Sequence, residues 1–538
     1  MKIVRLFLFV SLLVSVDSYA QPNVVLIVSD NQSPNLMGAY GNKDILTPSL
    51  DKLADEGVLF KRAYAVSGVC SPTRATLLTG LLPSQTGVHN GLPSVFPIKH
   101  WSAISEFRNL PQTLSDSGYK TAMIGKYHLG DSSKPQLGFD EWVVLGTGLT
   151  SSFYGARVLD NGKQYTVKKH LTDFWTDKGV EFIQKQTNKT PFFLYLSYNG
   201  PYALPPLITQ KPQNRHAQHY TQNMPAMPQE PVHPYLRQFA IETSSKEEVL
   251  LRQQQLKRWN VEDKTLTGKD GRLDPSNSLA WMAIGALNNK TAMINLASQM
   301  SMVDDGVDKI MSALEAHGFD DNTIVIFTSD HGAEYGKHGL WGNGTWSKPA
   351  AAFNDTVQVP LIVHLPGQKG IGQRSPALIN QFDIFPTILD LLGMNDKKIV
   401  NTPGQSFAPL ITEERDPAWR NTVFYEHIDT RAIVKPGWKY IARLFGQPSE
   451  LYDLSKDPDE KNNLIADKKY RKIQQDLRDE MMEFFEQYAD PKYDPWRGGT
   501  AKAVLMYKGK NDDFKNTFPN WVPPFVEANE IFSDMDRE

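Results

Sequence analysis

Three continuous apolar runs constrain the fold of this chain more than any other feature of its sequence. They cover residues 23–29, 191–196 and 323–329, and the first and third are followed directly by Asp30 and Asp330. A run without polar alternation is typical of a strand that is buried on both faces, as in a parallel sheet. Ligands of open α/β sheets gather at the carboxyl ends of such strands. Both aspartates are therefore candidate site residues.

Helical patterns lie between the apolar runs. Residues 47–56 are predicted to form a helix, with Thr47 as its N-cap and Pro48 at its first position. Residues 172–184 and 292–317 also have helical periodicity. Alternation of strands and helices predicts an α/β fold, in which helices sandwich a large, mostly parallel or mixed sheet.

The order of these patterns divides the chain into two units. Residues 21–415 form the predicted N-terminal domain, and residues 416–538 form a smaller C-terminal subdomain and tail. Within the first unit, residues 212–290 are rich in Pro, Gln, His and charge, with one predicted helix at 245–259. We expect an insertion or lid over the site, although a solvated loop would fit the same composition.

The C-terminal subdomain is predicted to be α+β. Residues 435–441 and 450–454 have the pattern of hairpin strands, and residues 467–488 have helical periodicity. We therefore expect a short antiparallel sheet that packs against one helix.

The first twenty residues have the pattern of a cleavable secretory signal. Lys2 and Arg5 precede an apolar core at 6–16, and Ala20 ends a small-residue cleavage site. The core is too short to span a bilayer, so we expect a periplasmic or secreted protein with no membrane insertion. A net charge of −3 over 538 residues gives no reason to expect a nucleic-acid partner.

Cys70 is the only cysteine of the chain, so it cannot form an internal disulfide. A lone cysteine is often only a small buried hydrophobe. This one, however, begins the pattern Cys-x-Pro-x-Arg with Pro72 and Arg74, at the start of a predicted helix. The N-terminal end of a helix favours an anion, because its backbone N–H groups are exposed there.

Two further blocks contain residues that can take part in catalysis or bind a metal ion. Lys126 and His128 lie in Gly-Lys-Tyr-His-Leu-Gly, and Asp330 and His331 lie in Ser-Asp-His-Gly. These blocks follow one another in a fixed order, with the cysteine block between the two aspartates. By this order of motifs, the chain resembles the type I sulfatases of the alkaline phosphatase superfamily. The resemblance extends from Val24 to about residue 464. It makes residues 21–415 the expected catalytic domain.

The resemblance implies a modified nucleophile. Cys70 is expected to be oxidised to formylglycine by a formylglycine-generating or sulfatase-maturing enzyme. Arg74 and Lys126 are expected to hold the hydrated aldehyde and the sulfate oxygens. His128 resembles the base that takes a proton from the second hydroxyl as sulfate is released. A route of covalent attack followed by elimination is not open to a simple serine.

The resemblance also implies a divalent cation, and the expected ligands are Asp30, Asn31, Cys70, Asp330 and His331. Oxygen ligands favour Ca²⁺, with Mg²⁺ or Mn²⁺ as alternatives. Asn31 stands where sulfatases usually have a second aspartate, so the site loses one negative charge. His331 stands where asparagine is also frequent, and it could contact the sulfate instead.

The leaving-group side departs further from the family. Tyr202 follows a proline where histidine is common, and Asn343 stands where lysine is common, with Lys348 as a candidate replacement. We therefore predict Tyr202, His331 and Lys348 as substrate-binding residues. The general acid stays unassigned, and its candidates are His216, His219, His338 and Lys348.

These features predict a secreted sulfatase that hydrolyses a sulfate ester of a polysaccharide or oligosaccharide. Trp281, Trp341 and Trp346 are candidates for stacking on sugar rings. Two alternatives stay open, namely a phosphonate monoester or phosphodiester hydrolase of the same superfamily and a non-catalytic glycan-binding relative. The sequence does not identify the sugar or the sulfate position, nor whether action is endo or exo.

Overall fold

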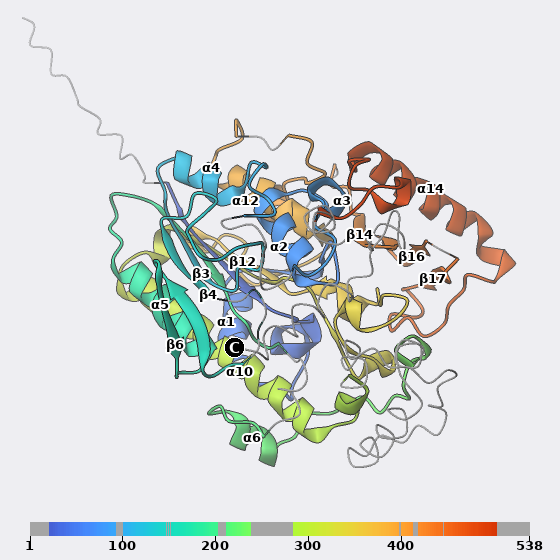
Figure 1. The fold of residues 1–538 in the computed structure, drawn as a ribbon, viewed down its shortest axis with the longest axis horizontal. Coiled ribbons are helices and arrows are strands. Elements are labelled where there is room, and N and C mark those ends of the chain that lie inside the picture. Colours follow the sequence, from blue (N-terminus) through green and yellow to red (C-terminus); the bar gives the residue numbers. More distant parts are fainter. Residues whose placement is uncertain are drawn as a thin grey trace, which may run out of the picture.

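The computed structural model describes residues 21–92, 101–146, 148, 150, 152–202, 211–237, 283–397, 400–412, 418–444 and 446–502. These residues form an eleven-stranded mixed sheet, a two-stranded hairpin and a separate four-stranded antiparallel sheet. Helices cover both faces of the large sheet, and the small sheet lies to one side of it with its own helix (Figure 1).

Parallel strands form the centre of the large sheet. Strand β1 (Asn23–Ser29) pairs in parallel with β7 (Phe192–Ser197) on one side and with β8 (Thr323–Ser329) on the other. Next to β7 lie β3 (Lys120–Gly125) and β4 (Glu141–Leu145), also parallel. The three apolar runs therefore form buried strands of the sheet, as predicted.

Antiparallel pairings at both edges make the sheet mixed, as expected. Beyond β4 lie β5 (Ala156–Asp160) and β6 (Lys163–Val167). Beyond β8 lie, in order, β12 (Leu361–His364), β2 (Val58–Tyr64) and β11 (Gln358–Val359), and β13 (Gln373–Asn380) pairs with β2 in parallel.

Each face of the sheet has its own hydrophobic core. Val25 and Ile27 of β1 face the layer of α1 (Pro48–Asp55), α5 (Leu171–Gln184) and α10 (Lys290–Ala316). Val24, Leu26 and Val28 face the opposite layer, which contains α2 (Cys70–Thr79), α4 (Leu110–Asp116) and α12 (Ile384–Leu391). Figure 1 shows these two layers on either side of the strands. Burial on both faces explains why β1 has no polar alternation.

The strand register brings several carboxyl ends to one level. Ser29 lies opposite Ser329 in the β1–β8 pair, and Ser197 at the end of β7 lies opposite Gly125 at the end of β3. The residues that directly follow these four strands must therefore lie close to one another. The residues that follow directly include Asp30, Asp330 and Lys126.

The helix predicted at 47–56 is α1, with Thr47 at the N-cap position and Pro48 at the first position as predicted, but the side-chain capping bond comes from another residue. The Thr47 hydroxyl makes no cap bond and instead donates to the Asp51 carboxylate at 3.1 Å. Asp304 of α10 satisfies the helix start, because its carboxylate accepts from the backbone N–H groups of Ser49 and Leu50 at 3.2 and 2.8 Å. A residue 254 positions away has replaced the local cap.

Buried Asp304 is expected to make stability depend on pH. Burial raises its pKa from 3.8 to about 6, although the two backbone N–H groups favour the carboxylate. The folded protein then binds more protons at this site than the unfolded chain does, so its contribution is full below pH 3.8 and is lost as the pH rises through about 6. In denaturant titrations, wild type should lose about 2–3 kcal/mol relative to Asp304→Asn between about pH 4 and about pH 7. A difference that is constant over this range would contradict the expectation.

The C-terminal subdomain has the predicted antiparallel sheet and helix. Its strands are β14 (Val423–His427), β15 (Thr430–Lys435), β16 (Trp438–Arg443) and β17 (Glu450–Asp453), and its helix is α14 (Arg471–Tyr488). The stacked rings of Phe424 and Phe484, 3.6 Å apart, join the sheet to the helix.

Two predicted boundaries in this subdomain are wrong. The strand predicted at 435–441 begins only at Trp438, because Pro436 and Gly437 form the turn between β15 and β16, with Gly437 at φ 84°. The α-helix predicted from residue 467 begins at Arg471, because Asp467 caps a preceding 3₁₀ turn at 468–470.

Several predictions fall outside the described residues, namely the signal at 1–20, the helix at 245–259, Trp281 and the domain boundary after residue 415. Of the predicted insertion at 212–290, residues 212–237 and 283–290 are described. The first stretch contains α6 (Ala217–Gln222), and α10 begins at Lys290. The remaining short elements are α3 (Pro83–Thr86), β9 (Glu334–Tyr335), β10 (Trp341–Gly342), α11 (Asn354–Val357) and α13 (Ala408–Thr412). In the part of the chain that the structure describes, no helix has the length and apolar character needed to span a membrane.

Candidate active site

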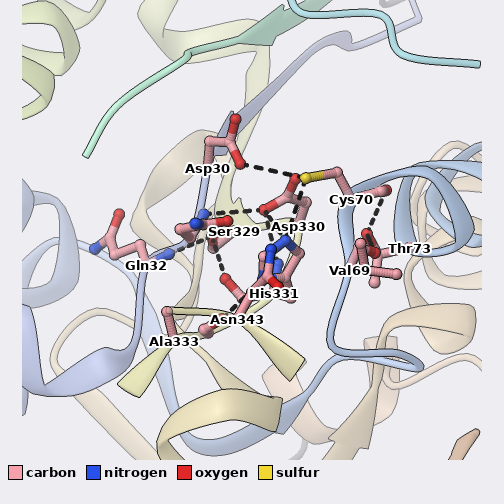
Figure 2. A network of polar contacts seen from close by, with 12 residues as sticks. Asp30, Gln32, Val69, Cys70, Thr73, Ser329, Asp330, His331, Ala333 and Asn343 are labelled. Carbon is pink, nitrogen blue, oxygen red and sulfur yellow. Dashed lines mark hydrogen bonds and ion pairs between the residues drawn. The ribbon is translucent and has the colours of Figure 1, made fainter. Parts of the chain in front are cut away.

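Four predicted site residues meet at the carboxyl end of the central strands. One ligand atom from each of Asp30, Cys70, Asp330 and His331 lies within 4.8 Å of the others, and all four side chains are buried. The Cys70 sulfur lies 3.7 Å from Asp30 Oδ1 and 3.4 Å from His331 Nε2 (Figure 2). We call these four residues the acidic cluster.

Cys70 is placed against the cluster by the start of α2. All ten residues of this helix are buried, and its N-cap, Val69, provides no side-chain cap. The Thr73 hydroxyl contacts the carbonyl oxygens of Val69 and Cys70 at 3.1 and 2.7 Å, which fixes the first turn (Figure 2). The first N–H groups of a helix have no partner within it, so they favour an anion beside Cys70.

Lys126 lies between the cluster and a tyrosine ring. Its ammonium donates to Asp30 Oδ2 at 2.6 Å and to the Cys70 sulfur at 3.2 Å. The same ammonium lies 4.9 Å from the centre of the Tyr202 ring, within the range of a cation–π contact. Lys126 follows β3 directly, so its position is a consequence of the sheet register.

Arg74 joins the second carboxylate to the sheet. Its Nε and Nη2 donate to Asp330 Oδ2 at 3.1 and 2.8 Å, while Nη1 donates to the Lys126 carbonyl at 2.7 Å and to the Ser197 hydroxyl at 2.5 Å. Arg74 is completely buried, and so are both aspartates and Lys126. Two buried carboxylates are thus balanced by two buried cations, as burial of charge requires.

Burial also sets the protonation of the cluster. Burial, followed by the neighbouring Asp330, raises the pKa of Asp30. Burial alone would raise the pKa of Asp330, but His331, Arg74 and Lys126 outweigh it and hold that pKa below its usual range. Burial raises the pKa of the Cys70 thiol far above its ordinary value. An unmodified Cys70 would therefore stay a thiol, which is a poor nucleophile.

His128 has the protonation pattern of a base. Its Nε2 lies 2.8 Å from the Leu92 carbonyl oxygen, which can only accept, so Nε2 carries the proton. The other ring nitrogen, Nδ1, is buried and has no hydrogen-bond partner among the described residues. Burial, and then the charge of Lys126, lowers the pKa of His128 well below 6.5. The imidazole is therefore neutral, with a free lone pair on Nδ1.

The cluster has the donor set of a site for a divalent cation. Carboxylate oxygens of Asp30 and Asp330 are ligands that Ca²⁺ and Mg²⁺ prefer. Asn31 is 1% exposed, yet neither its amide oxygen nor its amide nitrogen has a hydrogen-bond partner in the described structure. A buried amide without partners is costly, and a bound cation would satisfy its oxygen. These residues fit the predicted cation.

The sequence prediction missed two serines that organise the site. Ser197 ends β7 and accepts from Arg74, and its position directly after the second apolar run was an available signal. Ser71 donates to the His128 carbonyl at 2.8 Å and accepts from the Leu92 N–H at 2.9 Å. It therefore links the backbone of His128 to that of Leu92, whose carbonyl contacts the His128 ring, and its place beside Cys70 gave little indication of this role.

The predicted substrate-binding residues are placed differently from one another. Tyr202 is buried beside Lys126, and His331 belongs to the cluster. Lys348 is exposed, and its backbone N–H donates to the Tyr235 carbonyl at 3.3 Å. Asn343, which stands where lysine is common, uses its side-chain oxygen to accept from the N–H of Thr345 at 3.1 Å.

The candidate general acids make contacts of their own. His216 pairs with Asp305 at 2.7 Å, and His219 packs edge-on against Tyr220. Both ring nitrogens of His338 are engaged, by Glu334 at 3.3 Å and by the Asp459 carbonyl at 2.7 Å. Nothing in these contacts assigns the acid.

Two of the tryptophans proposed to stack on sugars are buried. Trp341 is 2% exposed and packs against Tyr335 with ring centres 5.4 Å apart, and Trp346 is 4% exposed. Both belong to the core on the α10 side of the sheet. Their proposed contact with a sugar is therefore wrong, because neither ring offers a face to solvent.

Comparisons with known proteins agree with this geometry. The sulfatase family model matches residues 22–394, and the model described as N-sulphoglucosamine sulphohydrolase, C-terminal, matches residues 342–487. The chain is 27% identical over 531 residues to an N-acetylglucosamine-6-O-sulfatase of Bacteroides thetaiotaomicron, covering 91% of this chain and 89% of that protein. It is also 27% identical over 539 residues to the N-sulphoglucosamine sulphohydrolase of Homo sapiens, covering 89% and 92%.

A solved structure has the same fold. It is a complex of a protein with its substrate D-glucosamine-2-N,6-O-disulfate, with a TM-score of 0.68 at 25% identity, and it covers 87% of this chain and 98% of the other. The matched regions include the acidic cluster, Arg74, Lys126 and His128. The chain belongs to the sulfatase family and is a sulfatase of the alkaline phosphatase superfamily.

Proposed function

We propose that this sulfatase hydrolyses a sulfate group on a glucosamine residue of a sulfated saccharide, by means of a formylglycine made from Cys70 and a divalent cation. The single observation that carries the proposal is the position of Cys70 at the start of α2, with its sulfur 3.2 Å from Lys126 Nζ and within 4.8 Å of carboxylate oxygens of Asp30 and Asp330. The saccharide class comes from the relatives, whose names specify 6-O- or N-sulfated glucosamine.

The modification accounts for a thiol that its surroundings keep protonated. Formylglycine, once hydrated, supplies one hydroxyl that can attack sulfur and a second whose deprotonation releases the sulfate. Lys126 can donate to the attacking oxygen, since its ammonium already contacts the sulfur atom that this oxygen replaces. Arg74 holds Asp330 and the Lys126 backbone in place, so it fixes the geometry of the cluster as well as its charge.

His128 is the proposed base for sulfate release. Its Nδ1 is unprotonated and unpartnered among the described residues, which is the state that a base needs before it accepts a proton. Tyr202 has a strongly raised pKa because it is buried and because Cys70 and Asp30 are near, so its phenol stays a hydrogen-bond donor. We assign Tyr202 to substrate binding and leave the general acid open.

The charge of the site supports a cation. Asp30 and Asp330 are already balanced by Lys126 and Arg74, so a divalent ion adds net positive charge to the buried site. An anionic sulfate ester complements that charge. We propose Asp30, Asn31, Asp330, His331 and the modified Cys70 as ligands, with Ca²⁺ preferred over Mg²⁺ and Mn²⁺. Such an ion would screen the charge that develops on the sulfate oxygens.

Export and maturation complete the proposal. Residues 1–20 are proposed to direct the chain to the periplasm or the outside of the cell, with cleavage near Ala20. A formylglycine-generating or sulfatase-maturing enzyme is the proposed partner, because Cys70 is buried at 3% exposure and must be oxidised before the chain folds around it.

The proposal is tested with a panel of matched substrates. Purified protein should release sulfate from glucosamine 6-O-sulfate or N-sulfate with a kcat/KM at least about 100-fold above that for an aryl phosphonate monoester or an aryl phosphodiester. All of these substrates carry one negative charge, so the difference reports recognition of the sulfate group and the sugar rather than of charge. A reversed order would favour the phosphonate or phosphodiester hydrolase instead. Activity on sulfated galactose but not glucosamine would contradict the proposed sugar alone.

A further inference from the structure

Asn31 has a backbone that is fixed on both sides and a side chain that is not. Its φ is 61°, in the left-handed region that asparagine tolerates better than most residues. Its N–H donates to Asp330 Oδ1 at 3.1 Å, and its carbonyl accepts from the Tyr335 hydroxyl at 2.5 Å. The amide group itself has no hydrogen-bond partner among the described residues. The peptide is therefore locked while the proposed ligand oxygen stays available.

Tyr335 is well suited to hold that peptide. It is 7% exposed, and its hydroxyl donates to the Asn31 carbonyl from within the core. Its ring packs edge-on against Trp341, with ring centres 5.4 Å apart, and the two residues are paired across the β9–β10 hairpin. In this packing the hydroxyl contacts the Asn31 carbonyl.

The hairpin is itself braced by buried polar contacts. Glu334, next to Tyr335, accepts from the Thr356 hydroxyl at 3.2 Å and contacts His338 at 3.3 Å. The His338 ring stacks on Phe353 at 4.1 Å. These contacts keep β9 from shifting relative to the large sheet, because α11, which contains Thr356, leads directly into β11.

We propose that Tyr335 is a positioning residue that, through the Asn31 peptide, aims the Asn31 amide oxygen at the divalent cation and thereby sets the affinity for that cation. Without the hydroxyl, the Asn31 carbonyl loses a buried partner, and the backbone on either side is held through the N–H groups of Asn31 and Gln32, which donate to Asp330 Oδ1 and Ser329 Oγ at 3.1 Å each. The inference rests on the cation of the proposed function. It gives the β9–β10 hairpin a role in cation binding, although none of the proposed ligands belongs to the hairpin.

The test is cation affinity, measured without any substrate. Protein stripped with chelator is titrated calorimetrically with Ca²⁺, for wild type and for Tyr335→Phe. We expect the dissociation constant of the variant to be about 10–100-fold higher, as for other residues that orient a metal ligand. The loss of turnover should be recovered by adding more Ca²⁺, because the ligands themselves are intact.

Tyr119→Phe is the matched control. Tyr119 is also buried, and its hydroxyl also donates to a backbone carbonyl, that of Pro22 at 2.9 Å, but it lies before the start of β3, at the opposite end of the strand from Lys126. Both variants should lose similar thermal stability in chelator. Only Tyr335→Phe should bind Ca²⁺ more weakly, and an equal effect in both would reduce Tyr335 to a structural role.

A double-mutant cycle with Asn31→Gly isolates the path through Asn31. Glycine tolerates the left-handed φ and removes the amide. Tyr335→Phe should cause no further loss of affinity in that background, so an additive loss would overturn the inference. Binding of Ca²⁺, Mg²⁺ and Mn²⁺ that is undetectable in wild type would overturn it together with the cation. Sulfate release by wild type is measured separately, so the saccharide assignment is judged independently.

Discussion

Replacement of Cys70 by alanine is expected to reduce kcat by more than about 10⁴-fold, as removal of a covalent nucleophile does in other hydrolases. The residue is 3% exposed at the start of a helix that is buried throughout. Alanine is smaller than cysteine and keeps the helix, so the fold should survive. In the proposed mechanism, what is lost is the group that attacks sulfur and then releases the sulfate.

Measurements of thermal stability and of substrate binding distinguish loss of catalysis from misfolding of the variant. Cys70→Ala should keep the thermal transition of wild type to within a few degrees, because it removes one small buried side chain. It should also bind a sulfated glucosamine without converting it, since Lys126 and Arg74 remain. Turnover at the wild-type rate by this variant would remove Cys70 from the mechanism altogether.

Lys126→Met should have the second largest effect. Its ammonium contacts Asp30 at 2.6 Å and the Cys70 sulfur at 3.2 Å. Methionine keeps most of the buried stem but leaves Asp30 without its nearest cation. We expect kcat to fall by about 10²–10³-fold, as for other lost electrostatic contacts to a reacting group. Loss of a buried ion-pair partner should also cost about 3–5 kcal/mol of stability.

The chain offers a matched control for that loss of stability. Lys439 of β16 is also completely buried, and its ammonium pairs with Glu460 at 2.6 Å and contacts Asn354 at 3.2 Å. Lys439→Met should therefore destabilise the protein to a similar degree, with kcat unchanged below its melting transition. If both variants lost kcat equally, Lys126 would be a structural residue and its assigned contact with the reacting oxygen would be wrong.

The central strands could be predicted from the sequence, and strand β2 could not. Burial on both faces leaves β1, β7 and β8 without polar residues, and this pattern is visible in one dimension. Strand β2 has Lys61 and Arg62 in its middle, and most of β6 is exposed or half-buried. Strand β2 pairs with β11, β12 and β13, which are distant in sequence, so no local pattern records its place in the sheet. Strand β6 pairs with the preceding β5 across the Asn161-Gly162 turn, a local hairpin signal that the prediction did not use.

The same distinction applies to the site. Asp30 and Asp330 could be predicted because carboxyl ends of parallel strands meet, and the roles of Arg74, Lys126 and His128 followed from resemblance. Tyr335 reaches Asn31 across 304 positions of sequence, so only the folded chain shows that contact. The cap of α1 by Asp304 in place of Thr47 has the same cause. Rules based on local sequence fail where a residue distant in sequence provides the hydrogen bond instead of a neighbour.

The mass of the peptide that contains Cys70 tests the central claim most directly. Exchange of the thiol for an aldehyde makes this peptide about 18 Da lighter than its cysteine form, whereas ordinary oxidation of a thiol adds oxygen and makes it heavier. The account predicts the lighter mass in active protein, in proportion to its specific activity. Fully active protein in which Cys70 keeps the mass of an unmodified cysteine would contradict it.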